Sequence, residues 1–175
     1  MDYEDFVAAL FTKPNAREGR LAHAAIGIIG EVVELSQAVS RAEALEELGD
    51  VKFYIMAAVL ALGDDYVDTK WARALPVTKV AATQVLLEDS AAFLDLAKKV
   101  WIYGVPIADV AERCCTYLAN IRYAWGVAVE HLGFTPEAIE AHNRAKLRKR
   151  YPTGGYTDTG AQARADKIIT PTQGA

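Results

Sequence analysis

The sequence predicts an all-α protein, an antiparallel helical bundle formed by one domain. Apolar residues recur three and four positions apart through most of the 175-residue chain, which is the spacing of an amphipathic helix. No stretch shows sustained apolar–polar alternation, and the sequence contains no Asn-Gly or Asp-Gly hairpin turn. Glycine and proline divide the helical stretches, so short connections are expected between neighbouring helices.

Three helices are expected in the first third of the chain. A short helix covers about Tyr3 to Phe11 and ends before Pro14, because a residue that precedes proline disfavours the helical conformation. The second helix runs from about Arg20 to Ser40. The third runs from Glu43 to Leu62 and stops at Gly63.

A connector over Asp64 to Pro76 precedes three further helices and a C-terminal tail. One helix spans Val77 to Tyr103, and the next spans Ile107 to Leu132. The last begins at Thr135-Pro136, a capping residue followed by proline at the first helical position. We therefore expect a domain over residues 1–157, with halves 1–63 and 77–152, and an extended or mobile tail over 158–175.

Composition argues against several classes of protein. The net charge is −4, which gives no general attraction to nucleic acid or to an anionic membrane. The longest apolar run, Phe53 to Leu62, is shorter than the roughly 20 residues of a membrane-spanning helix. The acidic first residues are unlike a signal peptide, and Cys114 and Cys115 are neighbours in an apolar stretch. We expect a cytoplasmic protein with reduced thiols.

Two pairs of acidic residues mark the expected second and third helices. Glu31 and Glu34 lie three positions apart, as do Glu47 and Asp50, so each pair shares one face of its helix. The turn between the helices falls near Arg41 and is short enough to require an antiparallel hairpin. Glu34 and Glu47 are nearly the same number of residues from this turn, and so are Glu31 and Asp50. At a rise of about 1.5 Å per residue, Glu34 and Glu47 each lie roughly 10 Å along their helix. The two pairs should therefore lie at matching heights.

Four carboxylates at one level repel each other unless a divalent cation neutralises them. Mg²⁺ prefers oxygen ligands and bridges to substrate phosphates, so the pattern predicts a magnesium site. The alternative is that each pair is a solvated helix face. A di-iron bundle is disfavoured because that chemistry uses Glu-x-x-His pairs, and no histidine here has a glutamate three positions before it.

The expected last helix ends in a basic run. Residues 143–151 hold five cations and no acid, and Asn143, Lys146 and Arg150 fall on one face. Cations are common at helix C-termini. The same face could supply an amide and two cations to a polyphosphate already bound to metal. A double-stranded nucleic-acid site is disfavoured, because the run is short and lacks interleaved aromatic residues.

Together these residues resemble the MazG-like, all-α nucleoside triphosphate pyrophosphohydrolases. Gly30-Glu31-x-x-Glu34, then twelve residues, then Glu47-x-x-Asp50 is similar to the family's metal motif. Asn143-x-x-Lys146-Leu147-x-x-Arg150-Tyr151-Pro152, followed by Gly154-Gly155-Tyr156, is similar to its C-terminal signature. The resemblance implies that the four acids bind Mg²⁺ or Mn²⁺ and that Asn143, Lys146 and Arg150 contact phosphates.

One departure from the family pattern suggests an internal duplication. A loop that many members carry before the Glu-x-x-Asp helix occurs late here, at Trp101 to Pro106. The stretch from Leu87 to Arg150 reads like a second, degenerate unit. In it Glu88 corresponds to Glu31, and the aligned segment Tyr117 to Tyr123 corresponds to Glu47 to Phe53. Chance similarity between helices is the alternative.

The resemblance implies hydrolysis of a nucleoside triphosphate to the monophosphate and pyrophosphate, with Glu31 or Glu34 as general base. His23 lies about two turns before Glu31 and could line a base pocket. The segment from His23 to Ile28 is similar to bacteriophage members, which weakly favours a purine deoxynucleotide, dGTP first; a dUTP- or dCTP-type house-cleaning enzyme is the alternative. A non-catalytic nucleotide sensor or partner-binding bundle is the alternative from another class. By analogy with the family, a homo-oligomer, dimer or tetramer, is expected.

Overall fold

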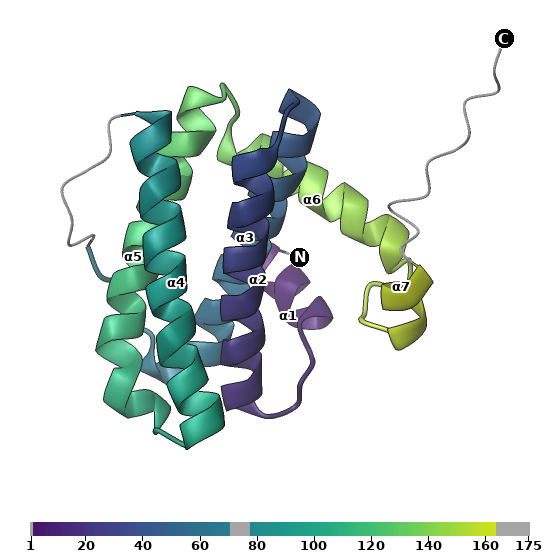
Figure 1. Cartoon of the computed structure of the whole chain (residues 1–175). Coiled ribbons are helices and arrows are strands. Elements are labelled where there is room, and N and C mark those ends of the chain that lie inside the picture. Colours follow the sequence, from purple (N-terminus) through teal and green to yellow (C-terminus); the bar gives the residue numbers. More distant parts are fainter. Residues whose placement is uncertain (1, 71–77, 164–175) are drawn as a thin grey trace, which may run out of the picture.

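The computed structural model describes residues 2–70 and 78–163, and all regular structure within them is helical (Figure 1). The predicted all-α class is therefore confirmed. The helices are α1 (Tyr3–Leu10), α2 (Arg17–Gln37), α3 (Arg41–Leu62), the 3₁₀ turn η1 (Gly63–Asp65), α4 (Lys79–Tyr103), α5 (Ile107–His131), α6 (Pro136–Arg150) and α7 (Asp158–Ala163).

Helices α2 and α3 form the expected antiparallel hairpin. Their connection covers residues 38–40, and α3 begins two residues before the predicted Glu43 because Ser40 and Glu43 form a capping box there. The Ser40 hydroxyl accepts from the Glu43 amide at 3.1 Å, and the Glu43 carboxylate accepts from the Ser40 amide at 3.2 Å. The start of α3 is thus fixed close to the acidic residues that it carries.

Helices α4 and α5 form a second hairpin, and α2 packs against α4 to make a four-helix bundle (Figure 1). Gly104 ends α4 in the left-handed conformation at φ 70°, which allows the reversal into α5. Fully buried side chains from all four helices fill the centre, including Leu21, Leu48, Phe93 and Leu118. The predicted start of α4 at Val77 lies outside the described residues.

Helix α6 leaves the bundle and lies across α3 (Figure 1). It begins as expected, with the Thr135 hydroxyl accepting from the Ala138 amide at 3.2 Å and Pro136 at the first position. Its buried face, formed by Ile139, Asn143, Lys146 and Leu147, meets α3 near Asp50. The arrangement brings the basic run next to the acidic residues.

The first part of the predicted extended or mobile tail over residues 158–175 is helical and not extended. Residues Asp158–Ala163 form α7, whose first turn is capped by the Thr157 hydroxyl accepting from the Gly160 amide at 3.0 Å. Lys13 pairs with Asp158 at 3.0 Å, and the Tyr156 amide donates to the Ala9 carbonyl at 3.4 Å. These contacts with the N-terminal region hold α7 near α1. Residues 164–175 lie outside the described part.

Among the described residues, no helix combines the length and the apolar character that crossing a bilayer requires.

Candidate metal centre and adjoining cavity

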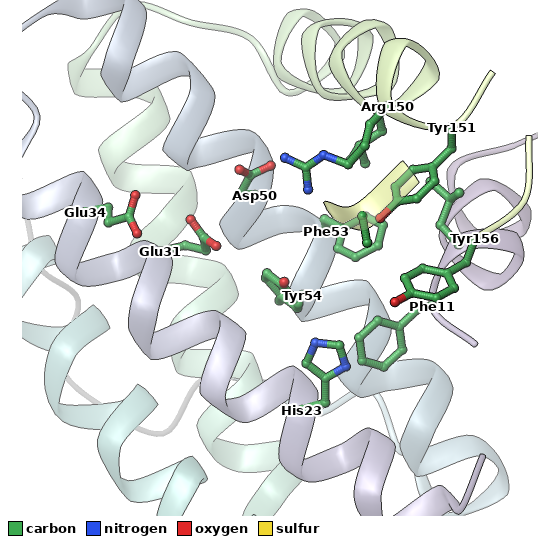
Figure 2. A pocket seen from close by; sticks show the side chains of 13 residues that line it. Phe11, His23, Glu31, Glu34, Asp50, Phe53, Tyr54, Arg150, Tyr151 and Tyr156 are labelled. Carbon is green, nitrogen blue, oxygen red and sulfur yellow. The ribbon is translucent and has the colours of Figure 1, made fainter. Parts of the chain in front are cut away.

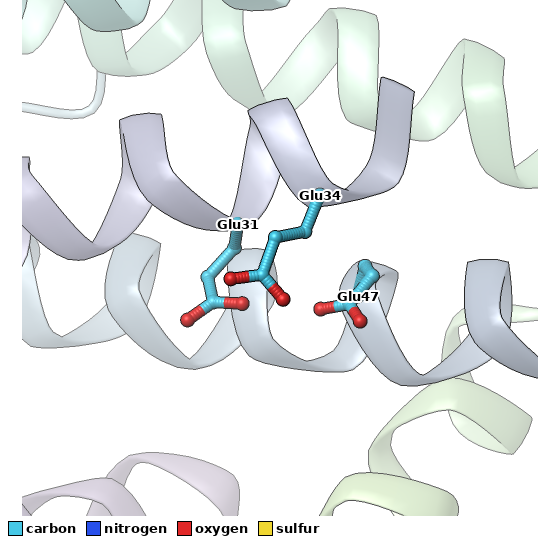
Figure 3. Close-up of side chains that lie close together, drawn as sticks. All are labelled: Glu31, Glu34 and Glu47. Carbon is cyan, nitrogen blue, oxygen red and sulfur yellow. The ribbon is translucent and has the colours of Figure 1, made fainter. Parts of the chain in front are cut away.

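Three of the four predicted carboxylates lie together between α2 and α3. Glu31 and Glu34 project from α2 and Glu47 from α3, and each offers an oxygen within 4.8 Å of the others (Figure 3). Glu47 is 8% exposed, whereas Glu34 reaches solvent. The matched heights predicted from the hairpin are thus observed for these three residues, which we call the glutamate trio.

Asp50 lies beside the trio but is bound by α6. The Asn143 amide nitrogen donates to Asp50 Oδ1 at 2.8 Å, and the Lys146 ammonium pairs with Asp50 Oδ2. Lys146 Nζ also lies 3.4 Å from a Glu46 oxygen. A donor from α6 therefore reaches each Asp50 oxygen, and Asp50 stands at the edge of the trio.

Burial and mutual repulsion raise the pKa values of carboxyl groups in this cluster and so favour their protonated forms. Burial, followed by the charge of Asp50 and by a hydrogen bond to Glu47, raises the pKa of Glu31 from 4.5 to about 8. Burial also raises the pKa of Glu47, although its hydrogen bond with Glu31 opposes the shift. The pKa of Asp50 is raised by burial and lowered by Lys146. A bound cation would displace these protons, because carboxylates coordinate metals in the ionised form.

The residues fit a hard divalent cation. The trio offers carboxylate oxygens, with no histidine or cysteine in the group, and Mg²⁺ and Mn²⁺ prefer such ligands. The solvent-facing side at Glu34 leaves room for water or phosphate oxygens, which magnesium usually keeps in its coordination shell. The donor set thus matches the metal chemistry expected from the sequence.

A cavity of about 340 Å³ opens beside the carboxylates (Figure 2). Glu31, Glu34 and Asp50 line one end, where Arg150 extends from α6 toward Asp50. Aromatic side chains form most of the remaining wall, which Leu10, Leu147 and Ala161 complete: Phe11, His23, Phe53, Tyr54, Tyr151 and Tyr156. The cavity therefore joins a charged end to an end built of rings.

His23 belongs to the aromatic end. Its ring stacks on Phe11 with centroids 4.8 Å apart and lies 5.8 Å from the Tyr54 ring. The His23 Nδ1 atom is 2.9 Å from the Lys13 carbonyl oxygen, so in the tautomer protonated at Nδ1 it donates to that oxygen. The structure thus places His23 where the sequence analysis expected a pocket residue.

Of the three residues of α6 that were predicted to contact phosphates, one lines the cavity and two are buried away from it. Arg150 lines the cavity, whereas Asn143 and Lys146 are buried against Asp50 and do not line it. Apart from His23, the aromatic residues of the cavity wall were not predicted from the sequence. Tyr54 follows Asp50 by four positions and therefore shares its helix face, a signal that was present in the sequence. Phe11 gave no such signal, because its place depends on how α1 packs.

The proposed second unit holds no comparable acidic group among the described residues. Glu88, the counterpart of Glu31, accepts a hydrogen bond at 2.9 Å from Gln84 on its own helix. Asn120, the counterpart of Asp50, is buried. The described residues form two helical hairpins, α2–α3 and α4–α5, and the superposition of these hairpins stays a prediction.

Comparison with protein-family models, with curated proteins and with solved structures finds no match for this chain.

Proposed function

We propose that the protein is a metal-dependent nucleotide pyrophosphohydrolase that converts a (deoxy)nucleoside triphosphate and water into the monophosphate and pyrophosphate. One observation carries the proposal: Glu31 and Glu34 of the glutamate trio line a cavity that has Arg150 at its charged end and aromatic rings at the other. A metal–triphosphate fits the first end, and a base fits the second.

The chemistry requires water to be activated and charge to be neutralised. The oxygen of water forms a bond to a phosphorus atom, the bridging bond between the α- and β-phosphates breaks, and a glutamate accepts the proton of the water. Glu31 and Glu34 are both eligible as this base. Bound Mg²⁺ or Mn²⁺ supplies positive charge to the phosphate oxygens. Arg150 contributes a guanidinium suited to bidentate contacts with phosphate.

The aromatic end supports a nucleotide in preference to a plain polyphosphate. Rings that face a narrow cavity stack favourably on a flat base. We propose a purine deoxynucleotide, with dGTP first, as the substrate. Preference for dUTP or dCTP is the competing outcome, since stacking alone does not select a base.

A panel of the eight common NTPs and dNTPs, each with Mg²⁺ or Mn²⁺, tests the proposal. We expect equal amounts of monophosphate and pyrophosphate, abolished by chelation. Glu34→Ala or Asp50→Ala should remove pyrophosphate release while circular dichroism stays helical. The matched control is Glu130→Ala, which removes an exposed acid of α5 outside the cavity. Turnover retained in the Glu34 and Asp50 variants contradicts the proposal, and metal-dependent nucleotide binding without turnover indicates a sensor instead.

A further inference from the structure

Tyr3, the first residue of α1, is connected to Asp50 at the candidate metal centre by two hydrogen bonds that pass through Asn143. Its hydroxyl donates to Asn143 Oδ1 at 3.0 Å, and the Asn143 amide nitrogen donates to Asp50 Oδ1 at 2.8 Å. Tyr3 is separated from Asn143 by 140 positions in the sequence, and the Asn143 side chain is fully buried. It does not line the cavity beside the carboxylates. The hydrogen bonds that join Tyr3 to Asp50 therefore run through Asn143.

The Tyr3 ring is held firmly enough to aim its hydroxyl. The residue is 7% exposed, and two cations lie against the ring: Lys52 Nζ at 5.6 Å and Arg144 Cζ at 5.1 Å from its centroid. Lys52 is itself paired with Glu140 of α6. Burial raises the pKa of the Tyr3 hydroxyl, so the group remains a protonated donor.

The hydroxyl fixes which end of the Asn143 amide faces Asp50. An asparagine side chain presents an acceptor at one end and donors at the other. Because Tyr3 donates to Oδ1, the nitrogen is directed at Asp50, where it restrains one carboxylate oxygen while Lys146 restrains the other. A carboxylate oxygen that accepts one hydrogen bond keeps a second lone pair, which can face a metal ion or its water.

We propose that Tyr3 is a positioning residue of the metal centre, which orients Asp50 through the Asn143 amide. The inference rests on the proposed function only for its turnover measurement, because divalent-ion binding can be measured without a substrate. Residues that orient metal-site carboxylates from outside the ligand set typically contribute 10–100-fold to metal affinity or activity.

The test compares the wild type with Tyr3→Phe, which keeps the ring and removes the hydroxyl. Mn²⁺ binding is measured by calorimetry, and turnover is measured as a function of Mn²⁺ concentration. We expect Mn²⁺ to bind about 10-fold more weakly in the variant. Turnover should recover when Mn²⁺ is raised to saturation, because Tyr3 touches neither substrate nor metal. The control is Tyr66→Phe, which removes a hydroxyl bonded to Asp68 and Arg122 and should bind Mn²⁺ like the wild type.

A double-mutant cycle with Asn143→Ala tests the route of the effect. If Tyr3 acts through Asn143, Tyr3→Phe has no further effect on Mn²⁺ affinity once Asn143 is alanine, and the two effects are not additive. Should Asn143→Ala fail to fold, Asp50→Asn replaces it in the cycle with the same expectation. Unchanged Mn²⁺ affinity in Tyr3→Phe, or a lower Tm as its sole change, overturns the inference.

The same measurements distinguish a failure of the proposed hydrolase function from a failure of the inference about Tyr3. A wild type that binds Mn²⁺ but releases no pyrophosphate from any nucleotide refutes the hydrolase, while the calorimetric comparison still decides the role of Tyr3. A wild type that shows neither Mn²⁺ binding nor turnover refutes both proposals.

Discussion

Glu31 couples the stability of the protein to pH. Its pKa is raised from 4.5 to about 8 on folding. Between these values the folded protein binds more protons than the unfolded chain, so the stability of the metal-free protein should fall as the pH rises through this window. Glu31→Gln cannot lose a proton, and we expect its free energy of unfolding to exceed that of the wild type by about 1–2 kcal/mol at pH 8. Chelator-treated samples melted between pH 5 and 8 provide the measurement.

Two further results would identify Glu31 as the source of this effect. Glu130→Gln, which neutralises an exposed acid of α5, should keep the wild-type pH dependence. If the proposed metal site is correct, added Mn²⁺ should stabilise the wild type most at the high end of the range, because carboxylates coordinate metals in the ionised form. Parallel pH profiles for Glu31→Gln and the wild type would show that the proton resides elsewhere.

Lys146 of α6 neutralises part of the negative charge of Glu46 and Asp50 on α3. The residue is 9% exposed and pairs with Asp50 and Glu46. Lys146→Met keeps much of the side-chain volume but leaves two half-buried carboxylates without this cation, which should cost about 3 kcal/mol. Urea unfolding measures the loss. Lys149→Met removes an exposed cation from the same helix and should cost about 0.5 kcal/mol, the value of a cation near a helix C-terminus. Equal losses would contradict a structural role for the buried pair.

Residue spacing in the sequence predicted the glutamate trio because the relative positions of its three residues depend on a single helical hairpin. A turn of known length and a rise per residue suffice to bring Glu31, Glu34 and Glu47 to one level. The partners of Asp50 could not be predicted in this way. Asn143 and Lys146 come from a helix more than 90 positions away, and their side chains turn toward Asp50 only because α6 crosses α3 at that height.

At the scale of the helices, the close packing of α2 against α3 determines where the Tyr54 ring lies in the cavity wall. Gly27 of α2 lies under the Tyr54 ring of α3, and a Cβ at this position would overlap the ring. Gly27→Ala should push Tyr54 toward the cavity, reduce stability by about 1–3 kcal/mol and weaken nucleotide binding. Thermal melts and nucleotide titrations measure both effects.

The same helix offers a matched control three positions later. A Cβ at Gly30 meets nothing within 4 Å, so Gly30→Ala should raise stability by about 0.5–1 kcal/mol through helix propensity. If Gly27→Ala behaved like Gly30→Ala, the close approach of the two helices would not matter for the cavity.

The ends of the elements were predicted where a local signal fixes them. Thr135-Pro136 predicted the start of α6, and Gly104 the end of α4, because capping and left-handed glycine are properties of a few adjacent residues. The short helix α7 was missed, because its small polar residues carry no apolar period. Its order depends on the distant contacts of Asp158 with Lys13 and of Tyr156 with Ala9.

At the scale of the whole molecule, three exposed apolar residues at the C-terminal end of α4 suggest a surface for self-association. Trp101, Ile102 and Tyr103 are 52%, 61% and 68% exposed, and they follow one another in sequence. Large exposed apolar side chains gathered at one helix end mark a candidate contact surface. We expect a dimer or tetramer in solution, in which these residues are covered.

Light scattering coupled to gel filtration measures the mass, and Ile102→Glu tests the surface. A charge placed in a buried contact is costly, so this variant should dissociate while its helical content stays unchanged. Val39→Glu is the control: Val39 is 91% exposed but isolated in the turn between α2 and α3, and its substitution should leave the mass unaltered. A monomeric wild type refutes the association, whereas an Ile102→Glu variant of wild-type mass would place the contact on another face.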